Sequence, residues 1–158
     1  MFSQKGEIVL KGKYPMPVNG NITSRYGYRV NPVTGEKSEF HKGLDIQPKH
    51  HSPIISIADG EVFLVNTKFS TYGNYIMIKH ELEEETFYSL YAHLSKVNVV
   101  DGQKVTQGQI IGLEGGEPGV DINPGSSTGH HLHFEIRQTA FSDSTVDPTL
   151  YILGNENK

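Results

Sequence analysis

The stretch HLHFEIR, residues 131–137, alternates polar and apolar side chains without a break. Side chains on a β-strand point to opposite faces in turn, so one set is expected to face a core. The apolar set consists of Leu132, Phe134 and Ile136. His131 and His133 then share the opposite face, whereas His130 has the other parity and is expected to point away. The stretch therefore predicts a strand that presents two imidazoles side by side.

Short runs of similar character fill the rest of the chain, separated by Gly, Asn and Asp-Gly turns, and strongly helical stretches are missing. This spacing predicts an all-β sandwich or barrel. The expected strands are Ile54–Ile57, Glu61–Asn66, Tyr75–His80, Thr86–Ala92 and Leu132–Arg137. A short helical turn is expected at Leu94–Val97. The segment VDGQKVTQGQIIG, residues 100–112, reads as two strands joined by a turn.

Length and composition limit the domain organisation, partners and metal ligands that the chain can have. A chain of 158 residues fits one domain with a sizeable core, and we place that domain at residues 14–153, between an extension at 1–13 and a frayed tail at 154–158. The net charge of −4 gives no general attraction to nucleic acid, so no nucleic-acid partner is expected. No apolar run approaches the length of about 20 residues that spans a bilayer, so no membrane insertion is expected. Without cysteine, any metal must be bound by His, Asp, Glu or water.

A second cluster of metal-binding residue types lies far upstream. FHKGLDI, residues 40–46, offers His41 and Asp45. A histidine, an aspartate and a second histidine from the strand at 131–137 supply the N, O and N donors of an open catalytic zinc site. Without the other cluster, His41 and Asp45 would be interpreted as a loop ion pair or a capping interaction, and the strand histidines as solvated surface residues. The two clusters together favour a metal.

Several other polar residues receive an interpretation from their position. In SLYAHLS, residues 89–95, His93 has the parity of Tyr91 and is expected to end a strand on its polar side. Glu135 and Arg137 continue the polar face of the histidine strand, where they could orient a ligand imidazole, but a surface ion pair is the favoured interpretation. Tyr26 and Tyr91 fit either a substrate groove or core packing. Four residues are expected outside any site: His50 and His51 in an exposed loop without partners, His80 in a structural role, and His130 as a bystander.

HKGLD, YAHLS and STGHHLHFEIR, in this order, resemble the lysostaphin-like (LytM-type) zinc endopeptidases of bacterial cell walls. ITSRYGYR, IADGEV, YGNYIMIKH, VVDGQKVTQGQIIGLEG and VDPTLYI also match the family's running order, so the resemblance covers Tyr14 to Leu153. It implies mainly antiparallel sheets of the β-sandwich type, a central groove and little helix. Two loops, at residues 115–129 and 31–40, are expected to shape that groove.

The resemblance also implies a role for each matching residue. His41, Asp45 and His133 correspond to the zinc ligands, with one Zn²⁺ expected per chain. His93 and His131 correspond to catalytic histidines that do not bind the metal. The implied reaction is metal-assisted amide hydrolysis, in which the two imidazoles exchange protons with water, the oxyanion and the leaving amine. The implied substrate is a peptide cross-link or stem peptide of peptidoglycan.

Two rival functions remain open at this point. A catalytically silent wall-binding or regulatory scaffold of the same fold would usually lack some of the five side chains. A carrier module with a modified lysine near the turn at Lys104 would leave the histidines unexplained. The start of the chain lacks the apolar core of a signal peptide. We therefore expect action at the cell wall either as part of a larger protein or as a phage lysin, released at lysis or carried in the virion.

Overall fold

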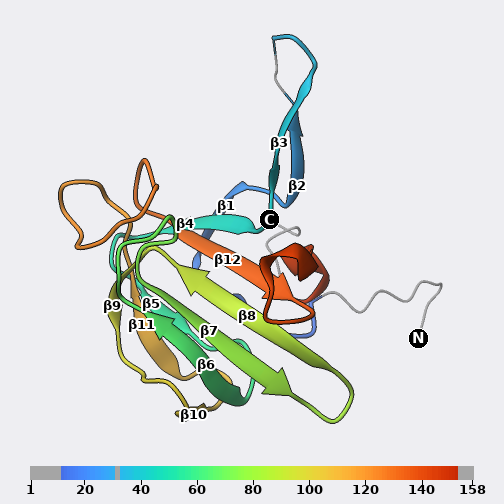
Figure 1. The fold of residues 1–158 in the computed structure, drawn as a ribbon, viewed down its shortest axis with the longest axis vertical. Helices are drawn as coiled ribbons and strands as arrows, with labels where there is room; N and C mark the ends of the chain where they lie inside the picture. The colour runs from blue at the N-terminus through green and yellow to red at the C-terminus, as the bar shows by residue number, and fades with distance from the viewer. Residues whose placement is uncertain (1–11, 31–32, 153–158) are drawn as a thin grey trace.

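The computed structural model describes residues 12–30 and 33–152, and its main feature is a large antiparallel sheet (Figure 1). The strand order in this sheet is β1-β4-β12-β8-β7-β6-β10, with β13 beside β12. Its strands are β1 (Gly20–Ser24), β4 (Leu44–Pro48), β6 (Gly60–Asn66), β7 (Tyr75–Glu81), β8 (Thr86–Ala92), β10 (Lys104–Val105), β12 (Leu132–Arg137) and β13 (Thr145–Val146). Neighbours far apart in sequence, such as β4 and β12, are thereby brought into direct register.

Two smaller sheets complete the fold. One has the order β5-β11-β9 and is built from β5 (Pro53–Ile55), β9 (Leu94–Val97) and β11 (Ile110–Glu114). The other is the hairpin of β2 (Gly27–Val30) and β3 (Lys37–His41), which projects from the body of the molecule (Figure 1). Within residues 12–30 and 33–152, helix is limited to two short 3-10 turns, η1 (Ser142–Ser144) and η2 (Pro148–Leu150). The all-β, antiparallel prediction is confirmed.

In the parts of the chain that are described, no helix has the length and apolar character needed to cross a membrane. The predicted tail, residues 154–158, lies outside the described residues. The predicted extension, residues 1–13, also lies outside them except for its last two residues.

The strand expectations hold best at the centre of the large sheet. Thr86–Ala92 and Leu132–Arg137 coincide with β8 and β12. The helical turn expected at Leu94–Val97 is wrong, because this segment is strand β9 and pairs antiparallel with β11. Its backbone groups find partners on another chain segment, and that long-range pairing overrides the local preference.

The segment at residues 100–112 contains two strands joined by a turn, β10 and β11, as expected. The two strands do not pair with each other. β10 pairs with β6 in the large sheet, whereas β11 pairs with β5 and β9 in the small one. The turn therefore links two sheets rather than closing a hairpin.

The main core lies on one face of the large sheet. The apolar residues of β12 belong to it as predicted: Leu132, Phe134 and Ile136 are all fully buried. Tyr91 of β8 lies in the same core, where its hydroxyl accepts a hydrogen bond from the Ile57 backbone N–H at 3.1 Å. Of the two roles considered for Tyr91, packing is therefore the one found.

The burial of His80 in β7 can be tested through the pH dependence of protein stability. The imidazole is buried, its Nδ1 donates to the Asp59 carbonyl at 2.8 Å, and its Nε2 lies 2.7 Å from the Ser89 hydroxyl. Burial lowers the pKa of His80 below its usual value. As pH falls below about 6.5, the unfolded chain binds a proton that the folded chain excludes, so the free energy of unfolding should fall.

We therefore expect His80→Gln to lose less stability than the unmodified chain between neutral pH and mildly acidic pH. Denaturant unfolding at a series of pH values measures this difference. Parallel stability curves for the two proteins would contradict a buried neutral His80.

Candidate metal centre

Strand register brings Asp45 and His133 to one face of the large sheet. β12 lies between β4 and β8, and His133 stands opposite Asp45 on one side and Ala92 on the other. Residues directly opposite in an antiparallel pair share a face, so both side chains point the same way. His41, the last residue of β3, reaches this face through a tight turn that contains Gly43. A Cβ at Gly43 would lie only 2.5 Å from the Phe134 carbonyl oxygen, so the turn can approach β12 this closely only with glycine.

The three side chains converge on a single point. Asp45 Oδ1 lies 3.2 Å from His41 Nε2 and 3.0 Å from His133 Nδ1. Each of the three offers a nitrogen or oxygen donor atom, and these atoms lie within 4.8 Å of one another. The exposed fractions of the side chains are 10% for His41, 16% for Asp45 and 9% for His133. The N, O and N donors predicted from sequence therefore form one compact, largely buried group.

Hydrogen bonds on the far side of each ring decide which nitrogen faces this group. His41 Nδ1 lies 2.9 Å from the Arg25 carbonyl oxygen, which can only accept, so Nδ1 carries the hydrogen and Nε2 is left as a donor atom for a cation. His133 Nε2 lies 2.8 Å from a carboxylate oxygen of Glu135, which can only accept, so Nε2 keeps its hydrogen and Nδ1, which faces Asp45, is the nitrogen that a cation would bind. Outer partners of this kind orient the imidazoles of metal sites.

His131 and His93 lie beside this group, with their rings 4.9 Å apart. His131 Nδ1 donates to the Gly129 carbonyl at 2.9 Å and lies 3.2 Å from the Ser127 hydroxyl. His93 Nδ1 donates to the Pro124 carbonyl at 2.9 Å. Both rings therefore keep Nε2 as the nitrogen without a hydrogen when they are neutral, and His131 Nε2 lies 3.7 Å from Asp45 Oδ1.

The backbone of His93 explains how this side chain reaches the site. Tyr91 faces the core, so the expectation that His93 shares a polar side with it is wrong. Regular alternation would direct His93 into the core as well. His93 instead adopts a φ of 63°, a left-handed conformation that is uncommon outside glycine, between the end of β8 and the start of β9. This twist turns the imidazole to the face that carries His131 and His133.

Electrostatics distinguish the imidazoles. Burial, together with the nearby His131 and His133, lowers the pKa of His93 to about 4. Burial also opposes charge on His133, but hydrogen bonds with Asp45 and Glu135 outweigh it and raise the pKa to about 9. For Asp45, burial raises the pKa, yet the hydrogen bonds from His133 and His41 hold it well below its usual range. Asp45 is therefore a carboxylate and His93 a neutral base at neutral pH.

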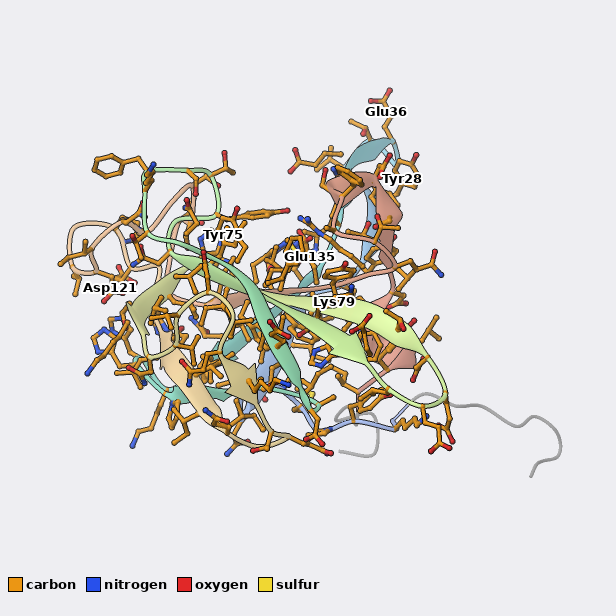
Figure 2. All side chains as sticks on the ribbon, turned by 60° about the horizontal axis from the view of Figure 1, so that its bottom comes forward. Tyr28, Glu36, Tyr75, Lys79, Asp121 and Glu135 are labelled. Carbon is orange, nitrogen blue, oxygen red and sulfur yellow. The ribbon has the colours of Figure 1, made fainter. Side chains whose placement is uncertain are left out.

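Glu135 and Arg137 correct another expectation. They do form an ion pair, with Arg137 Nε 2.8 Å from Glu135 Oε1, but both side chains are buried rather than on the surface. Figure 2 shows Glu135 in the interior of the molecule, away from Asp121 and the projecting hairpin. The other oxygen of Glu135 accepts hydrogen bonds from His133 and from the Tyr72 hydroxyl. Strand parity already allows Glu135 to orient His133, whereas nothing in the sequence pointed to Tyr72, 63 residues away.

Glu135→Gln should weaken zinc binding by about 10- to 100-fold, because the carboxylate fixes the ring of His133 and makes its Nδ1 more basic. Tyr72→Phe is the matched control, since it removes one hydrogen bond from the same carboxylate and keeps the charge. Competition with a chromophoric zinc chelator measures both affinities. Equal affinity in the unmodified chain and Glu135→Gln would contradict the orienting role.

The loop at residues 115–129 supplies the carbonyls that hold His93 and His131, as described above. It also corrects the expectations for three further histidines. His50 and His51 are not without partners, because both contact Asp121 in this loop. His130 was expected only as a bystander, but its Nδ1 lies 2.7 Å from the buried carboxylate of Glu114. The contacts with Asp121 join residues 70 and 71 positions apart, and the contact with Glu114 joins residues 16 positions apart, so strand parity could not predict them.

Comparisons with known proteins agree with the fold. Residues 39–148 match the family described as Peptidase family M23. The peptidoglycan DD-endopeptidase ShyA of Vibrio cholerae is 38% identical over 126 residues, which cover 78% of this chain and 26% of that protein. The curated relatives are longer proteins, since the chain spans between 21% and 30% of the length of the first four.

Solved structures are similar as well. A zinc-containing peptidase from Vibrio cholerae has 34% identity and a TM-score of 0.65, covering 89% of this chain and 39% of that one. The catalytic domain of lysostaphin from Staphylococcus simulans has 28% identity and a TM-score of 0.67, covering 82% of this chain and 90% of that domain. Family match, relatives and fold all lead to one assignment: the chain belongs to peptidase family M23, of the LytM/lysostaphin type.

Proposed function

We propose that the chain is a zinc-dependent endopeptidase that hydrolyses peptide cross-links or stem peptides of bacterial peptidoglycan. The observation that carries this proposal is the convergence of five side chains on one face of the large sheet. Three of them form the compact N, O and N group, and two imidazoles stand beside it with Nε2 available. A structural ion pair would not require the two additional, separately oriented imidazoles.

The donor group fits zinc. His41 Nε2, a carboxylate oxygen of Asp45 and His133 Nδ1 would hold the ion, leaving a position open to water or substrate, as in catalytic zinc sites. When bound, the ion supplies Lewis acidity toward an amide carbonyl and lowers the pKa of water. One carboxylate among three ligands leaves the site with a net positive charge, which favours both effects.

His93 and His131 would carry the protons. A lowered pKa of about 4 keeps His93 Nε2 unprotonated at neutral pH, and the Pro124 carbonyl fixes the ring so that this nitrogen faces the site. Gly129 fixes His131 in the same way. An imidazole that takes the proton of the attacking water can return it to the amine as the C–N bond breaks, and its N–H can stabilise the oxyanion formed in between.

The substrate class rests on the relatives. The name of ShyA specifies a peptidoglycan DD-endopeptidase, and that of lysostaphin's domain an antimicrobial peptidase. These names support the peptides of the bacterial wall as substrate and favour a cross-link between D-residues among the candidate bonds.

The proposed place of action is accordingly the cell wall, reached as part of a larger protein or as a phage lysin. Detection in purified virions would support the phage route, and a secretion signal in the full gene product would contradict it.

The rival function is a silent scaffold that binds or regulates without hydrolysis. Such a protein needs no converging proton carriers, yet His93 is held in a left-handed backbone conformation that turns it toward the candidate metal centre. Strained backbone is typically retained at functional sites. This observation favours hydrolysis over the scaffold.

Digestion of purified peptidoglycan tests the proposal. Mass spectrometry of the products should reveal water added across one amide bond, with a new amine and a new carboxylate at a single kind of linkage. Walls of differing cross-link chemistry identify the bond. Intact peptides after prolonged incubation with the zinc-loaded chain would overturn the proposal and favour the scaffold.

A further inference from the structure

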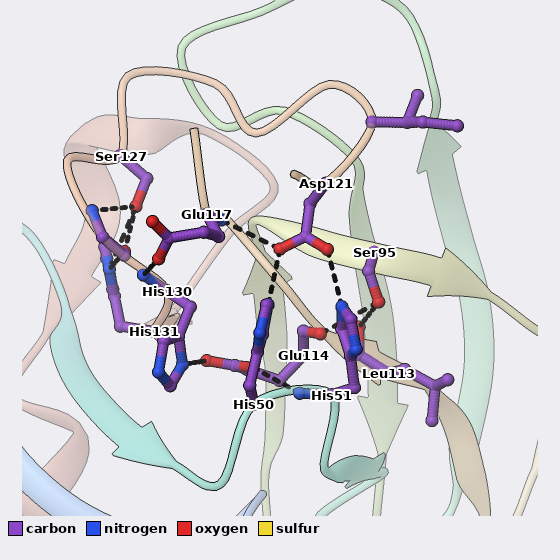
Figure 3. A network of polar contacts seen from close by, with 12 residues as sticks. His50, His51, Ser95, Leu113, Glu114, Glu117, Asp121, Ser127, His130 and His131 are labelled. Carbon is purple, nitrogen blue, oxygen red and sulfur yellow. Dashed lines mark hydrogen bonds and ion pairs between the residues drawn. The ribbon is translucent and has the colours of Figure 1, made fainter. Parts of the chain in front are cut away.

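A second cluster of metal-ligating side chains lies outside the centre described above (Figure 3). His50 and His51 belong to the turn between β4 and β5, and Asp121 belongs to the loop at residues 115–129. His50 Nε2 lies 2.8 Å from one oxygen of Asp121, and His51 Nε2 lies 2.6 Å from the other. One donor atom from each of the three lies within 4.8 Å of the others. The cluster therefore repeats the two-histidine, one-aspartate composition of the candidate centre.

The carboxylate of this cluster is buried. The side chain of Asp121 is only 4% exposed, while those of His50 and His51 are 29% and 46% exposed. The backbone N–H of Glu117 also donates to Asp121, at 2.9 Å, which fixes the carboxylate within its loop. A charge with so little access to water requires a compensating partner.

The surroundings hold the two imidazoles in place. Glu114 is fully buried, and it accepts hydrogen bonds from the His51 backbone N–H at 2.9 Å and from His130 Nδ1 at 2.7 Å. The ring of His130 stacks on that of His50, with centroids 4.5 Å apart. His51 adopts a φ of 70°, so its backbone is strained in the manner of His93. Hydrogen bonding therefore fixes the carboxylate of Asp121, stacking fixes the ring of His50, and His51 is held in a strained backbone conformation.

The rings of His50 and His51 stack with centroids 3.8 Å apart, and each ring turns its Nε2 toward a different oxygen of Asp121. An ion held among these atoms would be bound by two imidazoles through Nε2, while the carboxylate supplies the negative charge. Two imidazoles and one carboxylate suit zinc, and also copper or nickel, better than they suit calcium or magnesium.

We propose that His50, His51 and Asp121 bind a second divalent transition-metal ion, zinc in the first instance, which fastens the loop at residues 115–129 to the β4–β5 turn. The ion would close a long stretch of chain, since Asp121 lies 71 residues from His50 and 70 from His51. A metal ion that closes a long loop stabilises the folded protein by reducing the conformational entropy of the unfolded chain.

The fastened loop also carries the partners of the catalytic pair. Pro124 and Gly129 provide the carbonyls that hold His93 and His131, and the Gly115 carbonyl accepts from the His131 backbone N–H at 3.1 Å. The second ion would therefore act as a positioning element for both imidazoles. This consequence rests on the proposed hydrolytic function, whereas binding of the ion does not.

Calorimetric titration of the metal-free protein with Zn²⁺ tests the site itself. The unmodified chain should bind two equivalents. A variant carrying His41→Ala and His133→Ala should bind one, at the second site, and should bind none after Asp121→Asn is added. Asp121→Asn alone should retain one equivalent, at the candidate centre. Substitution with Co²⁺ in the His41→Ala/His133→Ala background should give the visible absorption of a low-coordinate N/O site, independent of any activity.

Lys49→Ala is the control, because Lys49 is an exposed residue of the same turn, and it should keep both equivalents. Circular dichroism establishes that each variant is folded, and His51→Gln serves as a second probe if Asp121→Asn is not. Failure of the His41→Ala/His133→Ala variant to bind any zinc would overturn the second site. Retention of that zinc in both Asp121→Asn and His51→Gln would overturn it too, and neither outcome bears on hydrolysis at the first centre.

Discussion

Alanine at His133 is expected to abolish zinc binding at the candidate centre and to reduce hydrolysis to the level of the metal-free chain. His133 contributes one of three donor atoms, and its Nδ1 lies 3.0 Å from Asp45 Oδ1. Its loss leaves a carboxylate and one imidazole, too few to hold zinc in a catalytic geometry. His41→Ala and Asp45→Ala should have the same two effects. Metal analysis of the purified variants, combined with a peptide-release assay, measures both.

His131→Ala is the matched control for this prediction, because His131 lies on the same strand face two residues away. It should lose activity while keeping zinc at the centre. The reverse pattern, in which His131→Ala loses this zinc and His133→Ala keeps it, would contradict the assignment of ligand and proton carrier. The Asp121→Asn background removes any contribution of the second site to the zinc count.

Replacement of His93 or His131, the two proposed proton carriers, is expected to have the second large effect. His93→Ala and His131→Ala should each lower kcat/KM by about 10²- to 10⁴-fold, the usual contribution of general acid–base catalysis. Neither side chain belongs to the N, O and N donor group, so zinc affinity should stay close to that of the unmodified chain. Because the pair acts on the same protons, the double variant should lose much less than the product of the two single effects.

His93→Gln refines this test. Glutamine keeps a polar group near the Pro124 carbonyl but cannot accept and return a proton, so activity should stay as low as in His93→Ala. Full activity in His93→Gln would assign His93 a structural role. Full activity in His131→Ala would remove His131 from the mechanism.

The local sequence pattern was sufficient to predict the strands at the centre of the large sheet. The alternation of residues 131–137 predicted both the bounds of β12 and the burial of Phe134, because strand periodicity depends only on adjacent residues. Parity also separated His130 from His131 and His133. It could not distinguish ligand from proton carrier within one face, and that assignment came from the family resemblance.

What the sequence could not predict depends on contacts between distant segments. Leu94–Val97 forms a strand because it pairs through backbone hydrogen bonds with β11. Nothing in the local sequence indicates that partner. His93 reaches the site through a positive φ, which breaks the alternation used to place it. Glu135 can be buried because Tyr72 and Arg137 donate hydrogen bonds to its carboxylate. A polar residue on a strand face is predicted to be exposed unless such partners are known.

The most direct test of the central claim is the rate of amide hydrolysis in cross-linked muropeptides as zinc is removed and restored. The chain is dialysed against a chelator, assayed, titrated with Zn²⁺ and assayed again, with His133→Ala treated in parallel. Hydrolysis should disappear with the metal and return as the centre containing His41, Asp45 and His133 is filled, with no recovery in His133→Ala. Turnover by the metal-free chain at its original rate would contradict the claim.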